Sequence, residues 1–170
     1  PQFTWEAAED PLVIKYIVEV LNGAGAVLYT ERVEGQLVFS YTLAQNKASN
    51  GGVALRAFTV RVRSIDMTGS FSEPVTLAVN KPAPPAVVPD LQPAGLSVVV
   101  SYERPALTTD IAGALVWMVQ ASGYDPLQKV PAYDGELNPV FIKGEKGKTY
   151  YVRVALYDSY GKSGLNISAE

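Results

Sequence analysis

Apolar and polar residues alternate along much of this chain with a period of two. In residues 14–20 and 58–63, every second residue is apolar, and most residues between them are polar or charged. Phe3 and Trp5 begin the same alternation at the start of the chain. A period of two is typical of strands that bury one face. No segment shows a sustained helical period, so the pattern predicts an all-β protein with many turns.

A proline-rich stretch, residues 81–89, interrupts the alternation near the middle of the chain. Each proline fixes its own φ and lacks the backbone donor that a sheet needs, so this stretch is expected to be extended. We therefore predict two domains, residues 1–81 and 82–170. The later part of the stretch is compatible with an irregular edge strand, where prolines are tolerated.

The two predicted domains repeat one another. Residues 58–70 match residues 150–162, with Val-Arg-Val at the same place and an Asp-x-x-Gly turn at the end of each run. The offset is constant across the run, because 150 − 58 = 92 and 161 − 69 = 92. The chain therefore contains an internal repeat of about ninety residues.

This repeat resembles the fibronectin type III fold, in which a Tyr-x-Val-Arg-Val run marks the sixth strand. Residues 150–163 carry that run, whereas the first copy has Phe58 in place of the tyrosine. The resemblance implies two tandem immunoglobulin-like β-sandwiches. It also implies an aromatic residue on the second strand of each copy, which Trp5 and Tyr102 provide.

The same comparison of the copies pairs Tyr16 with Trp117 on the third strand and makes Trp5 and Trp117 the largest core candidates. It also indicates that the first copy lacks its opening strand. Residues 1–5 already correspond to the second strand, whereas residues 81–93 precede that strand in the second copy. The second strand of the first copy is therefore expected to be an open sheet edge.

Two short segments, residues 60–66 and 71–74, resemble repeats of the tail-tip host-specificity proteins of long-tailed phages. That resemblance implies a non-catalytic spacer or adhesion module in a virion tail or a prophage product. The alternative is an accessory fibronectin type III module of a secreted bacterial carbohydrate-active enzyme. The expected partners are other domains of the same longer chain, and other tail proteins or a host surface receptor.

The composition argues against several other functions. The chain has no histidine and no cysteine, which removes the commonest general base, two common metal ligands and any disulfide. The formal charge is −3 without a basic stripe, so we expect no nucleic-acid partner. No apolar run approaches the ~20 residues of a membrane helix, so no membrane insertion is expected. We expect no catalytic residues, no metal site and no cofactor.

The candidate contact residues are aromatic or cationic. Tyrosine is enriched at protein interfaces, because it offers a large surface at low entropic cost. The four tyrosines selected are Tyr124, Tyr133, Tyr157 and Tyr160, with Tyr157 expected to face outward. Arg61 and Arg63 are expected on the outer face of one strand, either as a cationic strip for a partner or as solvent-facing charges that prevent aggregation.

Overall fold

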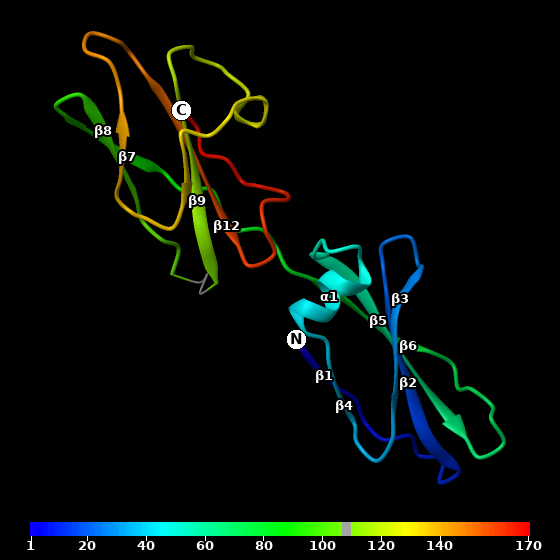
Figure 1. The fold of residues 1–170 in the computed structure, drawn as a ribbon. Helices are drawn as coiled ribbons and strands as arrows, with labels where there is room; N and C mark the ends of the chain where they lie inside the picture. The colour runs from blue at the N-terminus through cyan, green and yellow to red at the C-terminus, as the bar shows by residue number, and fades with distance from the viewer. Residues whose placement is uncertain (107–109) are drawn as a thin grey trace. The chain divides into compact units, whose positions relative to one another are not determined.

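The computed structural model describes residues 1–106 and 110–170 (Figure 1). The chain forms two compact units, Pro1–Pro82 and Ala83–Glu170. The units divide within the proline-rich stretch, between Pro82 and Ala83. Each unit has its own sheets and its own buried core.

The first unit contains two sheets and one short helix. Its four-stranded sheet has the order β3-β2-β5-β6, and β1 pairs with β4 in a second sheet. The elements of this unit are β1 (Gln2–Thr4), β2 (Val13–Leu21), β3 (Val27–Val33), β4 (Val38–Ser40), α1 (Leu43–Ser49), β5 (Ala57–Asp66) and β6 (Val75–Asn80).

The core of the first unit lies between its two sheets. Val18 and Val20 of β2 pack with Val60 of β5 and with Phe39 of β4, and all four are almost fully buried. Phe3 of β1 stacks on Phe39 with 6.1 Å between ring centroids. Interdigitation of side chains from two facing sheets is the arrangement of a β-sandwich.

Helix α1 was not predicted by the sequence pattern. It has only seven residues, which is too short to display a helical period. A capping box fixes its start, because the Gln45 amide N–H donates to Thr42 Oγ1 and the Thr42 amide N–H donates to Gln45 Oε1. Asn46 then anchors the helix to the unit through two hydrogen bonds with the backbone of Leu55.

The second unit also contains two sheets, with strand orders β10-β9-β12 and β11-β8-β7. Its elements are β7 (Pro89–Ala94), β8 (Ser97–Tyr102), β9 (Ile111–Val119), the short 3₁₀ helix η1 (Pro126–Gln128), β10 (Tyr133–Gly135), β11 (Val140–Lys143) and β12 (Tyr151–Asp158). Val100, Val116 and Val154 come from three different strands and are fully buried in one cluster between the sheets.

The register confirms most of the internal repeat. Asp66 and Asp158 close equivalent turns, in which the amide N–H of Gly69 or Gly161 donates to the aspartate carbonyl. Both glycines have a left-handed φ, +88° and +96°, which a residue with a Cβ adopts only with strain. The protein is thus all-β, with two tandem immunoglobulin-like sandwiches, as the fibronectin type III resemblance implies.

One pairing of the copies is wrong. Across the sheet, Glu19 pairs with Arg61 and Trp117 pairs with Arg153. The two arginines are 92 positions apart (153 − 61), so Trp117 corresponds to Glu19. By the same argument Tyr16, which pairs with Ser64, corresponds to Ala114 rather than to Trp117.

The two copies also differ at their first strands. In the second unit β8 is paired on both sides, by β7 and β11. In the first unit the equivalent strand is β1, just before Trp5, and within the part of the chain that the structure describes it pairs only with β4. No helix among the described residues is long and apolar enough to cross a membrane.

Candidate functional site

The predicted arginine pair lies on the outer face of the four-stranded sheet, around a buried acid. Arg61 Nε donates to Glu19 Oε2 at 2.8 Å, and Arg63 Nη2 donates to the same oxygen at 3.1 Å. Glu19 is only 9% exposed. The Arg63 guanidinium also lies 4.9 Å from the centroid of the Phe71 ring.

This arrangement gives Arg61 and Arg63 a role within the sheet that neither of the two alternatives expected from the sequence included. Burial raises the pKa of Glu19, but the hydrogen bond and charge of Arg61, with those of Arg63, outweigh burial and lower that pKa overall. The pair therefore keeps Glu19 ionised inside its own sheet. The side chains remain 28% and 29% exposed, which leaves part of each available to a partner.

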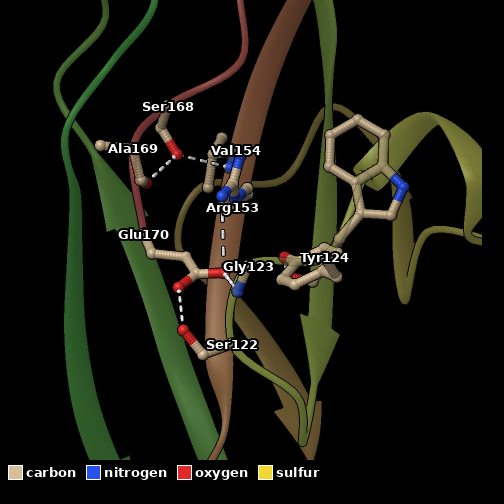
Figure 2. Close-up of polar contacts among 9 residues, drawn as sticks. Ser122, Gly123, Tyr124, Arg153, Val154, Ser168, Ala169 and Glu170 are labelled. Atoms are coloured by element: carbon tan, nitrogen blue, oxygen red, sulfur yellow. Dashed lines mark hydrogen bonds and ion pairs between the residues drawn. The ribbon is translucent and has the colours of Figure 1, made fainter.

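In the second unit, Arg153 takes the place of Arg61 and binds the last residue of the chain. The Glu170 carboxylate accepts hydrogen bonds from the Gly123 amide at 2.8 Å and from Ser122 Oγ at 3.0 Å, and Arg153 Nη2 lies 3.5 Å from it (Figure 2). Burial raises the pKa of Glu170, but these donors and the Arg153 charge lower it overall. Residues 122–123 and 170 are thus joined on one face of β12.

An apolar cluster lies beneath this contact, on the sheet face away from the sandwich core. It contains Leu115 and Trp117 of β9, Ala155 of β12, and Tyr124 from the segment after β9. Trp117 Nε1 donates to the Lys129 carbonyl at 3.2 Å, and the Tyr124 hydroxyl donates to the Trp117 carbonyl at 3.2 Å. The segment between β9 and β10 therefore covers Trp117. We expected Trp117 in the core between the sheets, but it lies on the outer face of its sheet.

Tyr124 consequently has a structural role within the unit. Its ring is buried, and the Arg153 guanidinium lies 5.3 Å from the ring centroid. Burial is the main cause of a raised Tyr124 pKa. Little of this side chain is available to a partner.

Tyr133 and Tyr157 lie on opposite faces of the same sheet. Tyr133 pairs with Val116 and packs against the core between the sheets, whereas Tyr157 pairs with Gly113 on the outer face, beside Asp134. The Tyr157 hydroxyl donates to Asp134 Oδ1 at 3.0 Å, and Lys162 forms an ion pair with the other oxygen of that carboxylate. Lys162 Nζ also lies 4.9 Å from the centroid of the Tyr157 ring. The Tyr133 hydroxyl accepts a hydrogen bond from the Leu137 amide at 2.7 Å.

In this group of side chains, the pKa of Tyr157 is raised and the pKa of Asp134 is lowered. Burial, followed by the bond to Asp134, raises the pKa of Tyr157 to about 12. The Lys162 hydrogen bond is the main cause of a lowered Asp134 pKa. The Tyr133 and Tyr157 rings are half-buried; Tyr157 lies on the sheet face away from the core, as expected, and retains surface for contact.

Tyr160 lies in the turn after β12, and its amide donates to Asp158 Oδ1 at 2.9 Å. The structure therefore brings Tyr157 together with Asp134 and Lys162, and it places Tyr160 in the turn between Tyr157 and Lys162. Tyr133 packs on the core side of the sheet instead. Tyr124 belongs to a different cluster, and Arg61 and Arg63 belong to the other unit.

Two features were not predicted from the sequence: the ion pairs of the buried Glu19 and an apolar groove. Glu19 stands between Val18 and Val20 in a run of nine strand residues, and an acid in that context signals a cationic partner across the sheet. The groove, of about 590 Å³, lies in the first unit and is lined mainly by Phe3, Trp5, Tyr16, Val62, Val75 and Leu77. Among the described residues, no group of three or more acidic side chains could hold a metal ion.

No family model matches the chain, and no curated protein matches it. Among solved structures, the chain is similar to a two-domain fibronectin type III segment from chicken tenascin. The two are 15% identical, the alignment covers 98% of this chain and 89% of that chain, and the TM-score is 0.46. The assignment of the fold to tandem sandwiches rests on the strand order and register described above.

Proposed function

We propose that this chain is a non-catalytic structural and adhesion module of a phage tail-tip host-attachment protein. Its parent protein belongs to a virion tail or is encoded by a prophage. Its partners are other domains of the same longer chain, with other tail proteins or a host surface receptor as external partners.

The proposal that the module is non-catalytic is supported by the ion pairs that its charged side chains form within each unit. Glu19, Arg153 and Asp134 each form an ion pair that joins segments of their own sheet or cover it. Within each sandwich, such pairs fix the side chains and segments that form its outer surface. A module built in this way offers rigid surfaces for protein contact.

The surface we assign to a partner is formed by Tyr157 and Tyr160, with Asp134 and Lys162 beside them; Tyr133 packs on the core side of the sheet and is not part of it. The hydrogen bond and the ion pair of Asp134 hold the Tyr157 ring in one orientation before a partner arrives. A fixed aromatic side chain loses little entropy on binding, and this favours a protein or glycan contact. Arg61 and Arg63 contribute a second, weaker candidate surface on the first unit.

The parent assembly can be tested by immunoelectron microscopy. Antibodies raised against this chain would be applied to particles released from the source organism after prophage induction. We expect gold labels at the end of the tail distant from the capsid, and we expect prior adsorption with the chain to abolish them. Absence of label on particles, with recovery of the antigen in a secreted hydrolase, would assign the chain to the alternative class instead.

The contact surface needs a separate test with the labelled chain and host cells. We expect the double variant Tyr157→Ala, Tyr160→Ala to reduce adsorption to host cells by about tenfold or more, because interface tyrosines often dominate binding. The matched control is Tyr150→Ala, because Tyr150 immediately precedes β12 and so lies far along the strand from Tyr157. Equal adsorption by all three proteins would exclude this surface.

A further inference from the structure

The groove of the first unit exposes side chains that a sandwich normally buries. On β6, Val75 pairs with Val62 of β5 and Leu77 pairs with Val60, so both face the inner side of the sheet. They are nevertheless 72% and 57% exposed. Exposed apolar side chains on an inner sheet face indicate that a covering element is absent.

The second unit shows what the covering element is. There β7 pairs with β8 in an antiparallel register that places Leu91 opposite Val100. Just before β7, Val87 is only 7% exposed and belongs to the same buried cluster as Val100 and Tyr102. The segment 84–94 therefore closes the second sandwich at the place where the first one is open.

The edge of β1 that faces away from β4 has backbone groups that can pair with such a strand. The Trp5 amide donates to the Leu37 carbonyl and the Tyr41 amide donates to the Pro1 carbonyl, so odd-numbered residues of β1 bond to β4. Backbone groups alternate in direction along an antiparallel strand, and those of Gln2 and Thr4 therefore point away from β4. Their equivalents in the second unit, Val99 and Ser101, lie opposite β7.

We propose that the groove of the first unit binds an extended peptide strand supplied from outside residues 1–82. The strand runs antiparallel to β1, hydrogen-bonds to Gln2 and Thr4, and inserts apolar side chains over Trp5, Val75 and Leu77. Its chemistry is that of segment 84–94, with an aliphatic anchor equivalent to Val87. This is strand addition to a sheet edge, and it does not depend on which parent protein carries the chain.

The experiment supplies the strand in the register that the second unit uses. Trp5 and Tyr102 are equivalent and 97 positions apart (102 − 5), so Pro1 corresponds to Val98. A copy of residues 84–97 is therefore joined directly to Pro1 of the full chain, which reproduces the β7–β8 hairpin. The same extension with Val87→Asp is the control for its anchor.

We expect the extension to slow amide hydrogen exchange at Gln2 and Thr4 by about tenfold or more, because formed strand bonds protect amides. The aspartate control should remove most of that protection. In the extended chain, Leu77→Lys should also remove it. Ala78→Lys should not, since Ala78 pairs with Thr59 on the opposite face of β6.

The source of the strand can be a second copy of this chain, and the same experiment detects it. A concentration-dependent dimer of the unextended chain that protects Thr4, and that the extension abolishes, would support the proposal with a second copy as donor. Unchanged exchange at Gln2 and Thr4 in the extended chain, in a correctly folded first unit, would overturn it.

Discussion

At the scale of single residues, Glu19 decides how Arg61 and Arg63 behave. Replacing both arginines with alanine leaves a nearly buried carboxylate without a partner. We expect a loss of about 2–3 kcal/mol in the free energy of unfolding of the first unit. This exceeds the roughly 0.5 kcal/mol of ordinary surface changes. Chemical denaturation of the double variant measures it.

A triple variant separates the arginines from the acid. Adding Glu19→Gln to the double change removes the unpaired charge, and we expect it to restore part of the lost stability. A double variant within about 0.5 kcal/mol of the parent would show that Glu19 is well solvated.

Tyr157 gives a prediction about pH. Its pKa is raised to about 12, so the folded state holds its proton more tightly than the unfolded chain does. Its contribution to stability is complete below the ordinary tyrosine pKa and is lost as pH rises towards 12. Asp134→Asn removes the acceptor charge and should lower the Tyr157 pKa. Ultraviolet titration of the phenolate, with Tyr157→Phe to identify the signal, checks this.

At the scale of the elements, Gly113 sets how β9, β10 and β12 fit together. A Cβ on Gly113 would lie 2.4 Å from the Tyr157 hydroxyl and 2.7 Å from the Gly135 carbonyl. We expect Gly113→Ala to displace Tyr157 and to cost about 1–3 kcal/mol, as overpacking usually does. Gly23→Ala is the control, because a Cβ there has no neighbour within 4 Å. The same melting temperature of the second unit in the Gly113→Ala and Gly23→Ala variants would contradict this packing.

The period of two was sufficient to predict the strands around Val18 and Val60, and the internal repeat predicted the strand around Val154. The alternation could not place Trp117, since both faces of β9 are apolar: Val116 packs in the core and Trp117 under the following segment. Alternation identifies a buried face only where the opposite face is polar. The Glu19 contact and the groove depend on which strands are neighbours, and a sequence pattern does not specify that.

At the scale of the whole molecule, each unit has its own core, so each should unfold as its own cooperative step. The first unit exposes Val75 and Leu77 in its open groove and should melt first. Calorimetry of the full chain should resolve two transitions. Chains of residues 1–82 and 83–170 should reproduce one each. The division into two units would be contradicted if the full chain unfolded in a single transition and neither shorter chain showed a cooperative transition.

The chain repeats one sandwich twice, and the first copy lacks the strand that closes the second copy. Amide-resolved hydrogen exchange on the monomeric chain tests this most directly, through the equivalent residues Thr4 and Ser101. We expect a protected Ser101 amide, bonded to β7, and a rapidly exchanging Thr4 amide at the open edge of β1. Equal protection of the two amides in the monomer would contradict it.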